Sequence, residues 1–307
     1  MSALEATLAD YLSLRRALGH KLAEHERQLT RFVAGLDDAG ASFVTMTNAL
    51  AFVFDPACDP ASSVPAKRLI AVRGFSRYLS AIDPRTEIPP TGLVSYRPNR
   101  RVPYMFSDQD VTAVVRAAQA STPSTFRAKT LACLIVLLAV TGMRVGESLR
   151  LNCCDIDWDQ AVIKVRDTKF GKGRDVVVSA STVEALAAYK SCRDARRPAT
   201  ARVFVSLTGT PVIYNNFSHT FHKAVIAAGV GAEGSTRPRV HDLRHSFAVH
   251  TLVRWYRVGQ DVEALLPRLS IYLGHREPRF TYQYLSATPE LLAHAVARMD
   301  AAQEVIR

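Results

Sequence analysis

A proline-rich segment constrains the fold more than any other feature of this sequence. The stretch DPRTEIPPTGLVSYRPNRRVPYMFSD, at residues 83–108, holds five of the chain's fifteen prolines. Proline has no backbone N–H and blocks the continuation of a helix, so no helix is expected to cross this segment. A chain of 307 residues is also longer than one typical domain. The sequence therefore predicts two domains joined by a linker.

The part before this segment is predicted to be entirely helical. Leucines such as Leu8, Leu12, Leu22 and Leu29 recur near helical spacing with arginine and lysine between them, which indicates one or two helices over residues 3–36. Further helices are predicted at 46–54 and 65–81, separated by the loop DPACDPASSVP.

The part after the segment changes its periodicity once. Helices are predicted at 108–120, 128–140 and 181–193, with a helix restarting in TGMRVGESLRL and helical patterns from residue 214 to the end. The short β-branched runs AVIKVR and DVVVS flank KFGKG and predict two strands joined by a turn, and VFVS is a candidate third strand. The expected fold is mainly α with a small antiparallel β-sheet, an α+β domain.

The net charge points to a polyanionic partner. Lysine and arginine number 39 against 28 acidic residues, giving a net charge of +11 and a pI near 9.7. Such an excess favours nucleic acid ahead of an anionic membrane. The most apolar run, ACLIVLLAV, has nine residues, against the roughly 20 that a membrane span needs. No transmembrane helix is expected, and the N-terminus lacks the pattern of a secretory signal, which predicts a cytoplasmic protein.

The cysteines are expected to be reduced thiols. Their number is odd and none forms a C-x-x-C pair, which argues against a disulfide framework and against a zinc site. They are Cys58, Cys133, Cys153, Cys154 and Cys192.

Two motifs in the middle of the chain place cations at breaks in regular structure. In TGMRVGE, Arg144 follows a helix break and could bind two phosphate oxygens, although an ordinary surface pair with Glu147 is the better explanation of this motif taken alone. In TKFGKGR, Lys169 and Lys172 lie on a β-turn. A lysine there can enter a DNA groove or donate a proton, or can simply be solvated.

Two later motifs carry the titratable rings. In HDLRH, His241 and Arg244 are three residues apart and share one helical face, which puts a proton acceptor beside a fixed cation. The adjacent His245 is predicted to support the structure. In LGHREPRFTYQYL, His275 precedes two tyrosines, Tyr282 and Tyr284.

In this order, the motifs TGMRVGE, TKFGKGR, HDLRH, LGH and YQYL resemble the tyrosine recombinase, or phage integrase, family over residues 106–290. The phrase YLSATPEL is similar to recombinases encoded by transposons. The resemblance implies a two-domain DNA clamp. It would comprise a helical core-binding domain of the SAM-like kind over 1–96, a basic linker over 97–105 and a catalytic domain over 106–307 that ends in a tail helix.

The resemblance also implies which tyrosine acts. In the family the nucleophile commonly lies nine residues after the histidine of the G-H motif, which selects Tyr284 and leaves Tyr282 and Tyr272 as packing residues. Counting back from DVVV places the family's lysine at Lys169, with Lys172 as the second choice. The segment between His245 and His275 is longer than in compact members of the family.

The implied reaction is attack of the Tyr284 hydroxyl on a DNA phosphodiester, which leaves a 3′-phosphotyrosine and a free 5′-hydroxyl. The other catalytic residues implied are Arg144, Lys169, His241, Arg244 and His275. Two arginines and His275 would stabilise the charge on the phosphate oxygens. His241 would accept the phenol proton and Lys169 would protonate the leaving oxygen. Glu147 and His245 would support these groups, and no metal, cofactor or ATP is expected.

The implied partner is double-stranded DNA, with the enzyme acting for a mobile element as a homotetramer on two sites and remaining a monomer or weak dimer when free. The location implied is the bacterial cytoplasm, on the nucleoid when DNA is bound. The residues singled out as candidates for DNA contact are Arg97, Arg100, Arg101, Lys172 and Arg174. The alternatives are a DNA-relaxing enzyme like a type IB topoisomerase and a DNA-binding protein with a decayed site.

Overall fold

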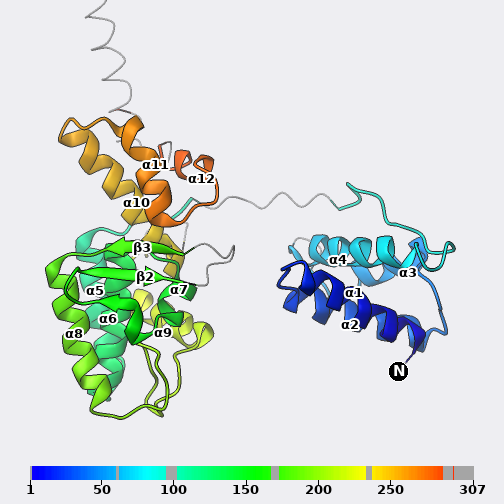
Figure 1. Ribbon diagram of the computed structural model, residues 1–307, viewed down its shortest axis with the longest axis horizontal. Coiled ribbons are helices and arrows are strands. Elements are labelled where there is room, and N and C mark those ends of the chain that lie inside the picture. The colour runs from blue at the N-terminus through cyan, green and yellow to red at the C-terminus, as the bar shows by residue number, and fades with distance from the viewer. Residues whose placement is uncertain are drawn as a thin grey trace, which may run out of the picture. The chain divides into compact units, whose positions relative to one another are not determined.

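The computed structural model describes residues 2–59, 62–94, 102–166, 173–232, 237–285 and residue 293. The chain divides into two compact units, Met1–Arg100 and Arg101–Arg307, which Figure 1 labels by their elements. Among the described residues, no helix is long and apolar enough to cross a membrane. The same residues hold no group of three or more His, Cys, Asp or Glu side chains placed to bind a metal ion.

The first unit is a bundle of helices. The periodic stretch at its start forms two helices, which break near Gly19, a glycine with a φ of 83°. Ser2 and Thr45 begin their helices as N-caps whose hydroxyls accept backbone N–H groups, which satisfies donors that have no partner inside the helix. Leu29, Val72 and Phe75 are fully buried in the core between these helices. The helices are α1 (Ala3–Ala17), α2 (Ala23–Asp38), α3 (Met46–Val53) and α4 (Val64–Leu79).

The first half of the proline-rich segment is attached to this unit. Arg73 of α4 donates from Nε to the carbonyl of Pro89 at 2.8 Å and from Nη2 to that of Pro90 at 2.6 Å. The backbone N–H of Glu87 donates to the carbonyl of Val44 at 2.8 Å. Prolines cannot donate, but their carbonyls accept, and these contacts hold the segment against the helices.

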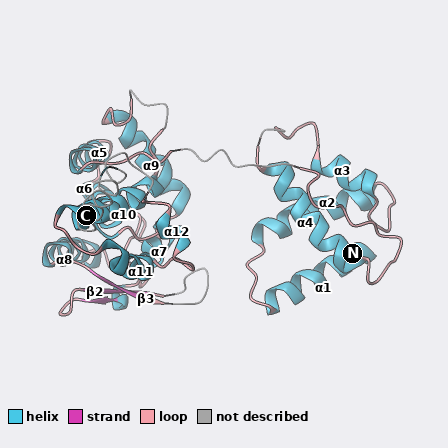
Figure 2. Ribbon diagram, turned by 90° about the horizontal axis from the view of Figure 1, so that it is seen from above, coloured by secondary structure: helices cyan, strands magenta, loops and turns pink. Residues whose placement is uncertain are grey.

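The second unit is built around α6, in which residues 131–140 are all apolar. Leu134 and Leu138 share one face of α6, Ile135 lies on the neighbouring face, and all three are buried. α5, α8 and α10 each pack against it, and α9 packs against α5 (Figure 2). The helices of this unit are α5 (Asp108–Ala120), α6 (Thr125–Thr141), α7 (Val145–Arg150), the short 3-10 helix η1 (Cys153–Asp155), α8 (Ala180–Asp194), α9 (Tyr214–Ala227), α10 (Val240–Arg257), α11 (Val262–Leu273) and α12 (Arg279–Tyr282).

A three-stranded antiparallel sheet covers one side of this unit. Its order is β1 (Ile156–Asp157), β2 (Val162–Val165) and β3 (Arg174–Val177), with Ile163 opposite both Ile156 and Val176. The sequence predicted β2 and β3 but not the two-residue β1. The candidate strand at 203–206 forms only an isolated bridge between Val205 and Pro211. Pro211 has no N–H, so a ladder cannot extend through it.

The long segment before His275 is mostly helical. α10 continues to Arg257, the chain turns at Gly259 with a φ of 70°, and α11 begins at Val262. The side chain of Asp261 caps α11 by accepting from the backbone N–H groups of Glu263 and Ala264 at 3.1 and 3.2 Å. Figure 1 shows α10, α11 and α12 gathered at one end of the unit, next to β3.

Candidate active site

Three arginines converge on the C-terminal end of α11. A helix leaves its last carbonyls without partners and carries a partial negative charge there, which suits cations. Each of three successive carbonyls accepts from a different guanidinium. Tyr272 O accepts from Arg174 Nε at 2.7 Å, Leu273 O from Arg244 Nη2 at 2.6 Å and Gly274 O from Arg144 Nη2 at 2.8 Å. Residues from β3, from α10 and from the start of α7 thus meet at one helix end.

Glycine is required where α11 ends. Gly274 has a φ of 68°, in the left-handed region, and an added Cβ would lie 2.6 Å from Nη1 of Arg174. Gly142, at the end of α6, repeats the arrangement with a φ of 60°, and its Cβ would lie 2.5 Å from the Phe247 ring. The Gly142 carbonyl accepts from Arg244 Nη1 at 2.9 Å. Two glycine-terminated helices therefore hold Arg244 between them.

Arg244 is almost fully buried yet remains a cation. Its exposed fraction is 2%. Burial and the charge of Arg144 lower its pKa to about 10, still well above neutral pH. α10 starts at Val240, just after Arg239, whose backbone N–H donates to the Asp242 carboxylate at 2.9 Å. This cap fixes the helical face that carries His241 and Arg244.

Glu147 links two of the three arginines. Its carboxylate accepts from Arg144 through the backbone N–H at 3.0 Å and through Nη1 at 2.8 Å. It also accepts from Arg174 Nη1 at 3.1 Å and Nη2 at 2.8 Å. Burial pushes the pKa of Glu147 upward, but the bonds and charge of Arg174, followed by the bonds of Arg144, prevail and lower it to about 2. Glu147 is therefore a carboxylate at neutral pH.

The side chain of Arg174, a candidate for DNA contact, is directed into the protein. The side chain of Arg174 is only 6% exposed, whereas that of Arg144 is 35% exposed. Nε, Nη1 and Nη2 of Arg174 all donate to Tyr272 or Glu147 inside the protein. Arg144 is thus the accessible member of the pair, and Arg174 lies behind it.

The two tyrosines of the last motif differ sharply in environment. Tyr284 is 3% exposed and belongs to the core formed with α10 and α11, whereas Tyr282 is 52% exposed. Burial raises the pKa of Tyr284, while the positive charges of Arg244 and Arg144 act in the opposite direction. Tyr272 donates its hydroxyl to the carbonyl of Val177 at 3.1 Å and stacks on Phe247, which is a packing role.

His275 packs against Tyr284 and lies near Arg244 and Arg144. Its ring stacks on that of Tyr284 with centroids 6.1 Å apart, and its Nδ1 is 2.7 Å from the hydroxyl of Thr281. Burial and the charges of Arg244 and Arg144 lower the pKa of His275 to about 3, so the ring is neutral at neutral pH. The sequence analysis missed Thr281, which is 1% exposed and lies six residues after His275.

The two histidines of α10 are linked to Tyr284 through His245, which contacts its ring. The His241 and His245 rings meet edge to face with centroids 4.8 Å apart, and His245 meets the Tyr284 ring in the same way at 5.5 Å. His241 has a solvent-exposed surface, yet the protein around it, followed by the nearby His245 and Arg244, lowers its pKa to about 4. Burial lowers the pKa of His245 as well.

Several predicted site residues lie outside the residues that the structure describes. They are the two candidate general acids, Lys169 and Lys172, the linker arginines Arg97, Arg100 and Arg101, and the tail helix predicted at 288–305. The predicted residues that the structure does bring together are Arg144, Glu147, His241, Arg244, His245, His275 and Tyr284.

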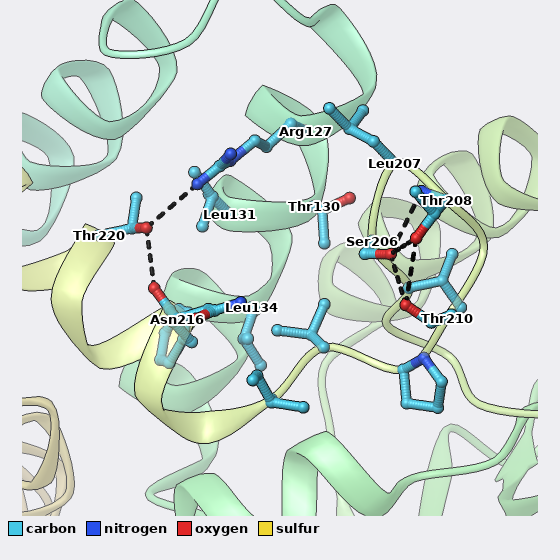
Figure 3. Close-up of a pocket in the computed structure, with 15 residues that line it drawn as sticks. Arg127, Thr130, Leu131, Leu134, Ser206, Leu207, Thr208, Thr210, Asn216 and Thr220 are labelled. Atoms are coloured by element: carbon cyan, nitrogen blue, oxygen red, sulfur yellow. Dashed lines mark hydrogen bonds between the residues drawn. The ribbon is translucent and has the colours of Figure 1, made fainter.

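A separate pocket of about 280 Å³ lies between α6, α9 and residues 205–213. Figure 3 shows Arg127 reaching Thr220 on one side and the hydroxyls of Ser206, Thr208 and Thr210 grouped on the other. Its lining contains none of the predicted catalytic residues. This cavity is therefore separate from the arginine cluster.

The mainly helical fold with its small antiparallel sheet agrees with the folds of known proteins that this chain resembles. The model of the phage integrase family matches residues 106–290. The chain is 41% identical over 308 residues to a putative integrase/recombinase, y4rB, of Sinorhizobium fredii, with 98% of each chain covered. The chain belongs to the phage integrase family, that is, to the tyrosine recombinases, and this membership supports a recombinase enzyme.

More distant relatives match over nearly the whole chain. The tyrosine recombinase XerD of Mycobacterium tuberculosis is 29% identical, with 92% of each chain covered. A Tn1549 transposon integrase in complex with transposon right end DNA has a TM-score of 0.63 at 15% identity, covering 96% of this chain and 98% of that one. A lambda integrase dimer bound to a COC' core site has a TM-score of 0.61 at 18% identity, covering 93% and 96%. These two structures show the fold.

Proposed function

We propose that this protein is a site-specific DNA recombinase that cleaves and rejoins DNA through a 3′-phosphotyrosine on Tyr284. The observation that carries the proposal is the meeting of Tyr284 with His275 and Arg244 at the end of α11. A nucleophile beside preorganised hydrogen-bond donors is what attack on a phosphodiester requires.

Charge stabilisation falls to the arginines and His275. The transition state gathers negative charge on the non-bridging oxygens of the phosphate, where bidentate guanidinium groups are effective. Arg144 is accessible enough to bind those oxygens, and Arg244 is fixed by two carbonyls. If the Thr281 hydroxyl donates to Nδ1 of His275, the neutral ring keeps its proton on Nε2 and donates it toward the phosphate.

Two proton transfers complete the reaction. The phenol of Tyr284 must lose a proton, and His241, neutral at pH 7 and at the surface of the site, is the proposed acceptor. The leaving 5′-oxygen must gain one, and Lys169 is its proposed donor, with Lys172 as the second choice. The phosphotyrosine ester retains the energy of the broken phosphodiester, so rejoining needs no ATP. The arginines supply the positive charge that a metal ion supplies in other phosphoryl-transfer enzymes.

The proposed substrate is double-stranded DNA, held by both units. The net charge of +11 suits a polyanion, and binding through phosphate contacts should weaken steeply with salt. The proposed role of residues 1–96 is DNA binding, and that of 97–105 is a basic linker. Two solved neighbours are integrases on DNA, one of them from a transposon, which supports action for a mobile element. Assembly of four copies on two sites is proposed as the form in which two DNA sites are exchanged.

Strand exchange is preferred to simple relaxation of supercoils. The relatives named above are a putative integrase/recombinase and a tyrosine recombinase, and neither is a topoisomerase. Relaxation of a plasmid without exchange between two sites would favour the topoisomerase-like alternative.

The direct test is trapping of the covalent complex. Incubation with a nicked duplex, from which the cleaved fragment diffuses away, should leave DNA attached to Tyr284, as located by mass spectrometry. Attachment should persist in excess EDTA. Strict dependence on magnesium would reject the proposed use of arginines in place of a metal.

A further inference from the structure

Arg174 occupies a position that the proposed reaction does not use directly. It is the first residue of β3, and its guanidinium lies behind Arg144, in the space left by the missing side chain of Gly274. Its Nη1 and Nη2 donate to the two oxygens of Glu147, and its Nε donates to the carbonyl of Tyr272. The same guanidinium therefore joins β3, α7 and the end of α11.

The charges around Glu147 show what this contact does. Glu147 is buried and ionised, and the described cations bonded to it are Arg144 and Arg174. A buried carboxylate binds strongly to a cation that it can reach, because little water screens the pair. With two cations on one carboxylate, the group formed by Arg144, Arg174 and Glu147 keeps a net charge of +1. Without Arg174, Glu147 would neutralise Arg144.

We propose that Arg174 is a positioning residue that acts through Glu147: it balances the carboxylate and fixes its orientation, so that Arg144 is held in place but keeps its charge for the phosphate. The inference rests on the proposed function. The two sides of Glu147 then have different tasks, since Arg144 faces the substrate and Arg174 faces the protein. Arg174 is not a catalytic residue, because it reaches the reaction only through Glu147 and Arg144.

A substrate that lacks one charged non-bridging oxygen can show whether Arg174 acts on the charge of the site or only supports the fold. In a methylphosphonate, a methyl group replaces that oxygen, so the transition state needs less positive charge. Arg144→Ala should cut cleavage of the ordinary phosphate by about 10²–10³-fold, as losing one such donor typically does, and should cut cleavage of the methylphosphonate much less. If Arg174 acts through Arg144, Arg174→Met should likewise lose more cleavage rate on the phosphate than on the methylphosphonate. The loss on the phosphate should be about 10–100-fold, the size typical of groups that orient a functional residue.

Arg193 provides a matched control in the same unit. It is also buried, at 6% exposed, and bonds to the carbonyl of Arg202 and to Asp194. Arg193→Met should lower the stability without changing the ratio of the two cleavage rates, because Arg193 is not bonded to Glu147. The rates are single-turnover rates of covalent complex formation, normalised to the folded fraction.

A double-mutant cycle tests the charge balance itself. Glu147→Gln removes the charge that Arg174 balances, so the pair Glu147→Gln with Arg174→Met should cleave the phosphate faster than Arg174→Met alone. If the fold-losses of the two single variants instead multiply in the double variant, so that it cleaves more slowly than Arg174→Met, the inference is overturned. Arg174→Lys keeps the charge with fewer directed donors, and it serves as the second variant if Arg174→Met fails to fold. Its cleavage rate should also fall more on the phosphate than on the methylphosphonate, but by a smaller factor than that of Arg174→Met.

The proposed function and the proposed role of Arg174 can be rejected by different results. If the unaltered protein forms no covalent complex with either substrate, the proposed function is wrong. If it forms the complex but Arg174→Met and Arg174→Lys lose both rates by equal factors, the reaction stands and Arg174 has only a structural role.

Discussion

The rings of His275 and Tyr284 lie nearly face to face, with their planes 24° apart and their centroids separated by 6.1 Å. Tyr282 has no comparable position and is 52% exposed. Tyr284→Phe should therefore abolish covalent attachment to DNA while leaving duplex binding intact, because only the hydroxyl is lost. Tyr282→Phe should leave attachment detectable. Gel analysis of trapped complexes checks both variants, and a phosphopeptide carrying DNA on Tyr282 would contradict the assignment.

Thr281 should matter for catalysis although it is not expected to touch the substrate. Thr281→Val keeps the shape of the side chain and removes the hydroxyl that holds Nδ1 of His275. Single-turnover cleavage should fall by about tenfold, the lower end of the effect of removing a group that orients a functional histidine. Thr281→Ser retains the hydroxyl and should stay near the original rate. Equal rates for the valine and serine variants would show that this bond has no role.

The second unit should lose stability in acid, and His275 should be one of the histidines that contribute to the loss. The pKa of His275 is about 3 in the folded protein, against an ordinary value of 6.5. Between these two pH values the ring is protonated in the unfolded chain but not in the folded protein, so lowering the pH favours unfolding. The contribution of His275 to the free energy of unfolding is therefore fully present above pH 6.5 and is lost as the pH falls toward 3. Glu147, with a pKa lowered from 4.5 to about 2, adds a loss below pH 4.5. Urea unfolding at several pH values measures the effect.

A control separates the His275 contribution from the others. His275→Gln cannot take up a proton in this range, so its free energy of unfolding should fall less between pH 7 and pH 4 than that of the unaltered protein. The same fall in both proteins would argue against a neutral, buried imidazole at this position.

The general acid can be tested by changing the leaving atom. Replacing the bridging 5′-oxygen with sulfur gives a leaving thiolate, whose conjugate acid has a pKa of roughly 8.5 by analogy with cysteine and hardly needs a proton. Lys169→Ala should cleave the oxygen substrate slowly and the sulfur substrate almost normally. Arg144→Ala and Arg244→Ala should stay slow on both. Rescue of Lys172→Ala instead would move the general acid to Lys172.

The sequence predicted most of the helices, because their apolar residues recur at helical spacing and residues 131–140 of α6 form a continuous apolar run. It did not reveal β1, since two residues are too few to show an alternating pattern. The sequence suggests Arg174 only as a candidate for DNA contact and does not reveal that its side chain is buried. Its actual partners, Glu147 and Tyr272, lie 27 and 98 residues away in sequence, and such distant contacts leave no local pattern. The same holds for the stacking of His275 on Tyr284, since their spacing of nine matched the family but did not give the geometry of the rings.

The successive carbonyls of Tyr272, Leu273 and Gly274 have a consequence for mutational mapping of this protein. The groups that anchor Arg174, Arg244 and Arg144 belong to the main chain. An alanine scan removes side chains and leaves every one of these acceptors in place. Such a scan would find the arginines themselves and Gly274, where an added Cβ would meet Arg174. At Tyr272 and Leu273 it would report the loss of the side chains and not the role of the carbonyls that hold the arginines.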